Sequence, residues 1–272
     1  MKTYSTQHGS LRLDPCTYGW SRLTFRGPRR PTDGRFIAFL GGTETFAKYV
    51  PKPFPDLIET ALGEVCVNLG CQAAGPDVYL RDTAAHSLCH DALATVIQVT
   101  TAANVSNDFY RVHPRRNDRF VAPSDKLRAL FPEVDFAEIA FTGHLITRLN
   151  AVDPVRFAIV RDHLRAVWID RMKALIALCG GPVFLLWFSA RDASDTADNT
   201  STGHPPHFIT SAMMETLRSH VDDVVEITST PGDTTGMRFS PLDTFAARDA
   251  IPLSAHAEAA KQLRPSLMQA LV

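Results

Sequence analysis

The residues best placed to do chemistry follow the short apolar run 36–40, where Gly41 and Gly42 lead into Thr43 and Glu44. Two glycines after a strand allow a sharp turn and close backbone approach, which leaves the next turn free to direct hydroxyl and N–H groups at a ligand. Thr43 could therefore be a nucleophile or an anion contact. The commoner role of such a threonine is to cap a helix, with Glu44 favourable in the first turn.

A second group of chemically capable residues lies in the stretch 113–119, which reads His-Pro-Arg-Arg-Asn-Asp-Arg. Three arginines within five residues, among them Arg115 and Arg116, can form a fork for a phosphate, sulfate or carboxylate group. The commoner alternative is a solvated loop whose arginines pair with the neighbouring aspartates.

No pattern in the sequence predicts a metal or a cofactor. His204 and His207 lack Cys or Glu partners at metal-site spacing, and His86 and His90 lack the Glu of a zinc-protease pattern. The Gly-Gly-Thr turn lacks the Lys of a P-loop and the third glycine of a dinucleotide-binding motif. The five cysteines include no Cys-x-x-Cys pair, so we expect reduced, mostly buried thiols.

Composition indicates an ordinary globular protein. The chain has 272 residues, 45% of them hydrophobic and 21% charged, with a formal net charge of -1. This balance gives no global attraction for nucleic acid or for an anionic membrane surface. We also expect no membrane span and no signal-peptide segment, and therefore a cytoplasmic location.

Several short apolar runs, rich in β-branched or aromatic residues, alternate with segments of helical spacing. Such runs are typical of strands buried on both faces of a parallel sheet. The alternation predicts a three-layer α/β/α sandwich with a mostly parallel five-stranded sheet. The predicted strands are 36–40, 65–69, 95–100, 183–188 and 224–228, and the predicted helices are 55–62, 77–93, 135–149, 155–179, 209–220 and 254–271.

The predicted domain organisation is simple. Residues 1–34 form an N-terminal lead-in segment, and residues 35–272 form one α/β domain. Insertions near 104–131 and 190–206 follow strands, so they should emerge at the carboxyl edge of the sheet, where open α/β sheets bind ligands.

The order of these segments resembles the SGNH (GDSL-like) hydrolase superfamily, and in particular a divergent bacterial branch of it. Residues 39–46, Phe-Leu-Gly-Gly-Thr-Glu-Thr-Phe, resemble the family's first block, Phe-x-Gly-Asp-Ser-x-Thr. Thr43 stands at the nucleophile position and Gly42 at the usual Asp. Residues 68–75 resemble the second block, whose glycine donates an N–H to the oxyanion; here that glycine is Gly70.

The third and fourth blocks are less complete. The family's Gly-x-Asn-Asp corresponds to a stretch that offers Asn104 or Asn107 without the glycine. The final Asp-x-x-His corresponds to Leu253-Ser-Ala-His256, so the acid that orients the base is missing from its usual place. Asp249, or Asp243, is the available upstream candidate.

The resemblance implies a sandwich of SGNH or flavodoxin-like type. It also implies an esterase or O-acyltransferase acting on an ester of a small molecule, sugar or lipid head group. Acyl transfer needs a nucleophile, a base and N–H donors for the oxyanion. Thr43, His256 and Gly70 with Asn104 or Asn107 would supply them, and Gly42 is a further candidate for contacting the oxyanion or the substrate. Two other functions stay open: a sulfo- or phospho-group transferase that uses Arg115 and Arg116 as an anion clamp, and a degenerate SGNH-like protein that binds without turnover.

Overall fold

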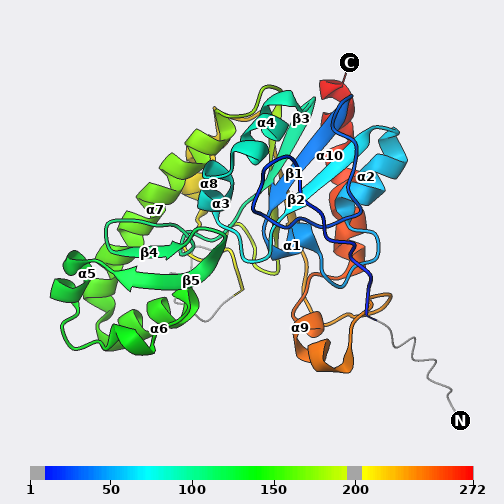
Figure 1. Ribbon diagram of the computed structural model, residues 1–272. Helices are drawn as coiled ribbons and strands as arrows, with labels where there is room; N and C mark the ends of the chain where they lie inside the picture. Colours follow the sequence, from blue (N-terminus) through cyan, green and yellow to red (C-terminus); the bar gives the residue numbers. More distant parts are fainter. Residues whose placement is uncertain (1–9, 195–203, 272) are drawn as a thin grey trace, which may run out of the picture.

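The structure of this chain is a computed structural model that describes residues 10–194 and 204–271. Within these ranges, five parallel strands form one sheet in the order β2-β1-β3-β6-β7 (Figure 1). All four neighbouring pairs in this sheet are parallel, as the sequence predicts. The strands are β1 (Phe36–Gly41), β2 (Val65–Gly70), β3 (Ala94–Gln98), β6 (Val183–Ser189) and β7 (Asp223–Thr228).

The apolar runs form strands because both faces of the sheet are covered. Along β1, Ile37 and Phe39 belong to one buried cluster, whereas Ala38 and Leu40 belong to the cluster on the opposite face. A strand buried on both sides needs apolar residues at every position, which is why its sequence does not alternate between apolar and polar.

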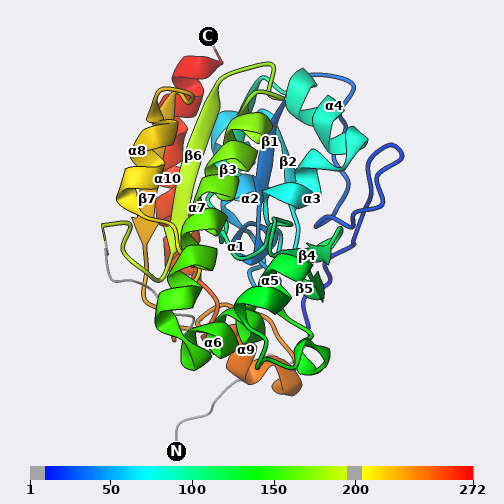
Figure 2. The ribbon, with the colours of Figure 1, turned by 90° about the vertical axis from the view of Figure 1, so that its left-hand side faces the viewer.

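Helices cover both faces and complete the predicted α/β/α sandwich (Figure 2). One face packs against α2 (Phe54–Leu62) and α10 (Leu253–Ala270). The other packs against α3 (Pro76–Leu80), α4 (Thr83–Asp91), α7 (Pro154–Ile176) and α8 (Ser211–Arg218). Of the helices in the described ranges, none combines the length and apolar character that a membrane crossing requires.

Two groups of elements extend the molecule beyond the carboxyl ends of the strands, at the lower left and lower right of Figure 1. The first is the hairpin β4 (Tyr110–His113) and β5 (Arg116–Pro123) with α5 (Asp125–Leu130), η1 (Phe136–Glu138) and α6 (Thr142–Val152). The second is η2 (Pro241–Asp243) with α9 (Thr244–Arg248). Of the predicted insertion 190–206, residues 195–203 lie outside the described residues.

The predicted helix over 77–93 is wrong, because the chain forms two helices there. Asp82 is the N-cap of α4, and its carboxylate accepts from the backbone N–H of Ala85 at 2.9 Å and from the hydroxyl of Ser21 at 2.8 Å. A capping carboxylate fixes a new helix start. The predicted helix over 135–149 likewise divides, into η1 and α6.

The N-terminal segment packs on the sheet. Tyr18, Leu23 and Phe25 are buried in the larger core cluster. The buried guanidinium of Arg26 donates to backbone carbonyls that follow β1, those of Phe46, Ala47, Val50 and Pro51. These bonds hold the first turn after β1 from outside the sheet.

The turn after β1 also depends on the absence of a side chain at Gly70. A Cβ at this position would lie 2.4 Å from the backbone nitrogen of Phe46 and 2.7 Å from the carbonyl carbon of Thr45. Because both are backbone atoms, neither can move without displacing the turn.

We therefore expect Gly70→Ala to lower the free energy of unfolding by about 3 kcal/mol, in the range of overpacked cores. Gly34→Ala is the matched control, because a Cβ there meets nothing within 4 Å. Urea unfolding of both variants measures the difference, and equal stabilities would contradict the close approach at Gly70.

Candidate active site

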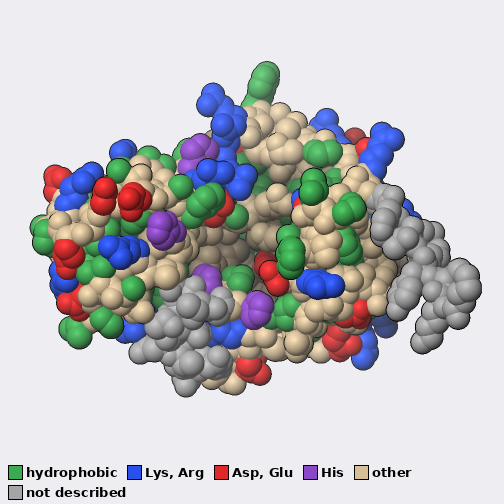
Figure 3. Space-filling view, turned by 90° about the horizontal axis from the view of Figure 1, so that it is seen from below, with side chains coloured by type: hydrophobic (Ala, Val, Ile, Leu, Met, Phe, Trp, Pro, Cys, Tyr) green, Lys and Arg blue, Asp and Glu red, His purple; other side chains and the backbone are tan. Residues whose placement is uncertain are grey.

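The strand order creates a natural opening at the carboxyl edge of β1 and β3. The chain leaves β1 for β2 on one side and returns to β3 on the other, so the loops that follow β1 and β3 run in opposite directions. Open α/β sheets bind ligands at such a switch point. A cavity of about 230 Å³, here called the switch-point cavity, lies there. Figure 3 shows this edge of the molecule with a hollow near its middle.

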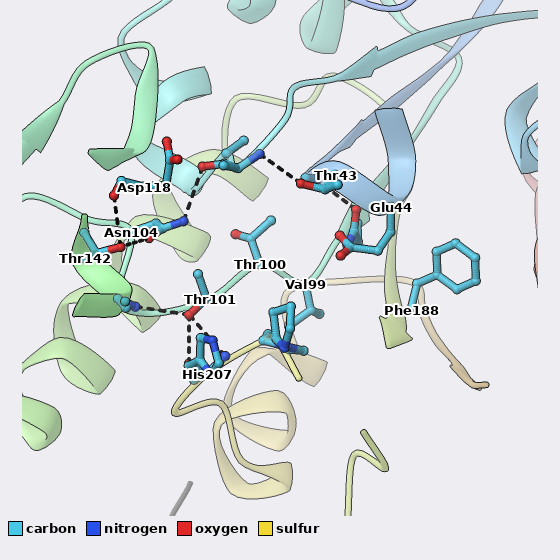
Figure 4. A pocket seen from close by; sticks show the side chains of 18 of the residues that line it. Thr43, Glu44, Val99, Thr100, Thr101, Asn104, Asp118, Thr142, Phe188 and His207 are labelled. Carbon is cyan, nitrogen blue, oxygen red and sulfur yellow. Dashed lines mark hydrogen bonds between the residues drawn. The ribbon is translucent and has the colours of Figure 1, made fainter. Parts of the chain in front are cut away.

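Polar side chains from distant parts of the chain line the switch-point cavity (Figure 4). Asn104 follows β3, and its Oδ1 accepts from the hydroxyl of Thr142, at the start of α6, at 2.7 Å. Its Nδ2 donates to the carbonyl of Ala73 at 3.3 Å. The polar lining comprises Thr43, Glu44, Gln98, Thr100, Thr101, Asn104, Asp118, Thr142 and His207.

Thr43 is the first residue of the short helix α1 (Thr43–Phe46) and is exposed. Gly42 is the N-cap, and no side chain caps this helix, so the interpretation of Thr43 as the cap is wrong. The Thr43 Oγ1 instead accepts from the backbone N–H of Ala73 at 3.1 Å (Figure 4). Because the oxygen is the acceptor in this bond, the hydroxyl proton can be donated to a ligand or a base.

Gln98 holds the turn from the end of β3. Its buried Oε1 accepts from the backbone N–H groups of Gly42 at 2.9 Å and Thr45 at 3.2 Å, and from the Thr45 hydroxyl at 2.7 Å. Its Nε2 donates to Glu44 Oε2 at 2.6 Å. One amide therefore fixes both the backbone of the turn and the carboxylate beside Thr43.

Glu44 is half-buried and lines the switch-point cavity together with a larger neighbour. Burial raises the pKa of its carboxyl group, and the hydrogen bond from Gln98 opposes this shift. A carboxyl group in a cleft with a raised pKa is a candidate acid–base group.

The larger neighbour has a volume of about 490 Å³ and is here called the His256 cavity. Thr43, Asp249 and His256 all line it, so the structure brings the predicted nucleophile, base and acid to one cavity. Asp249 is exposed at the end of α9. Asp243, the other candidate acid, instead accepts from the ammonium of Lys48 at 3.0 Å.

His256 is buried at the start of α10, between the aromatic rings of Phe54 and Phe188. Its Nδ1 accepts from the backbone N–H of Phe54 at 3.3 Å. This bond assigns the proton of the neutral ring to Nε2. Burial lowers the pKa of His256 to about 3, with a smaller contribution from the positive charge of Arg26.

The remaining predicted site residues lie elsewhere. Gly70 lines neither cavity, and its N–H donates to Asn68 Oδ1 at 2.9 Å. Asn107 closes a local turn, in which its Oδ1 accepts from the N–H of Phe109 at 2.8 Å. Arg115 and Arg116 line a separate cavity beside the N-terminal segment. The predicted donors Gly42 and Asn104 do line the switch-point cavity.

Sequence reasoning missed Gln98 and Thr142, and took Glu44 only as a favourable first-turn residue. Gln98 left a signal, since it is a polar residue at the end of an otherwise buried strand. Thr142 left none, because it lies 38 residues from its partner Asn104. Among the described residues, no group of three or more His, Cys, Asp or Glu side chains is placed to hold a metal ion.

Fold and site together define an α/β/α sandwich protein with a polar cavity at its topological switch point. The sequence matches, over residues 1–271, the family described as "Domain of unknown function (DUF6473)", and the chain belongs to that family. Among curated proteins, none matches it. A crystal structure of a protein from Lactobacillus plantarum, a structural-genomics target, aligns at 12% identity with a TM-score of 0.42, covering 86% of this chain and 97% of the other.

The buried His256 makes stability depend on pH. Its pKa in the folded chain is about 3, against about 6.5 in an unfolded chain, so the unfolded state binds the proton first as the pH falls. The contribution of His256 to the free energy of unfolding is fully present above about pH 6.5. Below that pH the free energy of unfolding falls by up to about 1.4 kcal/mol per pH unit.

We expect His256→Gln to remove this loss, because glutamine can still accept from Phe54 but does not titrate. Urea unfolding at a series of pH values between neutral and mildly acidic measures the slope. The exposed His220→Gln is the control for the substitution itself. Equal slopes in wild type and His256→Gln would show that the histidine is not held neutral.

Proposed function

We propose that this chain is an SGNH-like hydrolase or O-acyltransferase that acts on an ester of a small polar molecule. One observation carries the proposal: the exposed hydroxyl of Thr43 and the carboxyl group of Glu44 stand together between two cavities at the switch point. Sugars and lipid head groups with acyl groups belong to the substrate class that cavities of this size and polarity can take.

Thr43 supplies the attacking oxygen in this proposal. A β-branched side chain is stiff at χ1, which makes threonine a rarer nucleophile but also fixes its direction. The Ala73 N–H, 3.1 Å from Oγ1, stabilises negative charge on that oxygen as its proton leaves. The loop after β2 therefore prepares the hydroxyl before a substrate arrives.

Glu44, rather than His256, is the proposed acid–base group. His256 carries its proton on Nε2 because Nδ1 accepts from Phe54, so it is a hydrogen-bond donor rather than a base. General acid–base catalysis works best when the pKa lies near the working pH, and burial moves the pKa of Glu44 upward toward it.

The reaction follows from these assignments. Oγ1 of Thr43 bonds to the carbonyl carbon of the ester while its proton passes to ionised Glu44. The bond between that carbon and the alcohol oxygen then breaks, and the departing oxygen takes the proton from Glu44. Water, or a second alcohol in a transferase, then attacks the carbonyl carbon of the acyl-threonine while its proton passes to Glu44. The bond between that carbon and Oγ1 breaks, Oγ1 takes the proton from Glu44, and the acid or the new ester leaves.

A second candidate, a related protein that binds an ester without turnover, is favoured by a separate observation. The N–H groups of Gly42 and Gly70 already donate to Gln98 and Asn68. Two of the candidate oxyanion donors are thus occupied. Loss of such donors costs hydrolysis more than it costs binding.

Hydrolysis of p-nitrophenyl acetate and of an O-acetylated sugar panel separates these candidates. We expect Thr43→Ala and Glu44→Gln each to lower kcat/KM by about 10²–10⁴-fold, the usual contribution of an acid–base or nucleophilic group. Thr43→Ser keeps a hydroxyl and should retain turnover. In wild type kcat/KM should rise with pH as Glu44 ionises, and this rise should be absent in Glu44→Gln.

The matched controls are Thr60→Ala and Glu215→Gln, which make the same changes at exposed positions outside both cavities. Full turnover in Thr43→Ala or Glu44→Gln would remove the proposal. An ester that binds wild type without turnover, and whose binding is lost in Thr43→Ala, would support the second candidate instead.

A further inference from the structure

A basic cavity lies between the N-terminal segment and the hairpin β4–β5. Its volume is about 340 Å³. Arg22, Arg115 and Arg116 line it with His113, and among the described residues no acidic side chain does. Three guanidinium groups around one small space form an unusual concentration of positive charge for a chain with a net charge of -1.

The fold holds the two sides of the basic cavity in place. On one side, Arg22 is followed by the buried Leu23. On the other, the fully buried Asn117 ties the hairpin to the loop after β2. Its Oδ1 accepts from the N–H of Gly75 at 3.0 Å, and its Nδ2 donates to the carbonyl of His113 at 3.0 Å. The arginines therefore line the cavity from two anchored segments.

Two of these three guanidinium groups have no ion-pair partner among the described residues. Within the part of the chain that the structure describes, neither Arg22 nor Arg115 forms a salt bridge, whereas Arg116 pairs with Asp118 through two contacts of 3.4 Å. A second cavity, which Arg22 and Arg115 also line, adjoins the basic cavity. Of the described acids only Asp82 lines this adjoining cavity, and its carboxylate is held by Ser21 and Ala85. Positive charges without a partner that line one small cavity favour an anion there.

We propose that the basic cavity binds the phosphate or sulfate group of a small molecule. Arg22 and Arg115 provide planar, permanently charged donors from two separate segments, and guanidinium groups donate in pairs to tetrahedral oxyanions. Both arginines also line the adjoining cavity, whose rim carries Trp20 with 97% of its surface exposed. That ring offers an apolar surface to the rest of the ligand.

The basic cavity also borders the candidate active site. Gln72 lines both the basic cavity and the His256 cavity. A ligand anchored by its anionic group can therefore extend past Gln72 toward Thr43. Only this last step rests on the proposed ester chemistry; the anion site itself does not.

Isothermal titration of wild type with inorganic phosphate at pH 8 and low ionic strength tests the site, with sulfate, also a dianion, as a second arm. We expect one phosphate per chain. Arg22→Ala and Arg115→Ala should each weaken binding about tenfold or more, since each removes a charge-assisted contact. The ratio of the two affinities identifies the preferred group. Arg22→Gln and Arg115→Gln repeat the test with longer side chains.

Arg111→Ala is the matched control, because Arg111 is exposed on the same hairpin and lines none of these cavities. If neither anion binds to folded wild type at millimolar concentration, the proposal is overturned. So would equal weakening by Arg111→Ala and Arg115→Ala, which indicates only general attraction to a positive surface. Because no turnover is measured, failure of the ester proposal leaves this result unchanged.

Discussion

The candidate site depends on one buried amide, that of Gln98. Its oxygen accepts from the N–H groups of Gly42 and Thr45 and from the Thr45 hydroxyl, and its nitrogen donates to Glu44. An unpaired buried donor costs about 1–3 kcal/mol, so this oxygen stabilises the turn through three groups at once. The same amide prevents Glu44 from turning away. Backbone position and carboxylate position are therefore set by a single side chain.

Gln98 can act in this way only because β3 pairs with β1. The register places Leu40 opposite Ile97, so the end of β3 reaches the glycine turn directly. Close packing around the turn completes the constraint: the hydroxyl of Tyr79 accepts from the N–H of Gly41 at 3.0 Å. From β2, Asn68 Nδ2 donates to the carbonyl of Thr45 at 2.8 Å. The residues available for chemistry therefore stand on a turn held from both neighbouring strands, which is the preorganisation that a reactive group requires.

The sequence was enough to predict the sandwich, since each strand buried on both faces is a continuous apolar run. It was also enough to locate the edge of the sheet at which Thr43 and His256 line the same cavity. It was not enough where the outcome depended on distant partners. Asp82 starts a new helix inside a run with helical spacing, held by Ser21 from 61 residues away. The same holds for Glu44, whose carboxylate is placed by a residue 54 positions along the chain.

Two titratable groups of the candidate site, Glu44 and His256, share an environment that favours their uncharged forms. Burial raises the pKa of Glu44 and lowers that of His256. The wall near Thr43 thus suits a neutral group such as an ester, whereas the basic cavity beyond Gln72 suits an anion. A ligand with both groups could bind in only one direction, because reversing it would place the anion against a partly buried carboxyl group. Under the two proposals, the charge of the basic cavity fixes the orientation of the ligand, and this orientation places the acyl carbon beside Thr43.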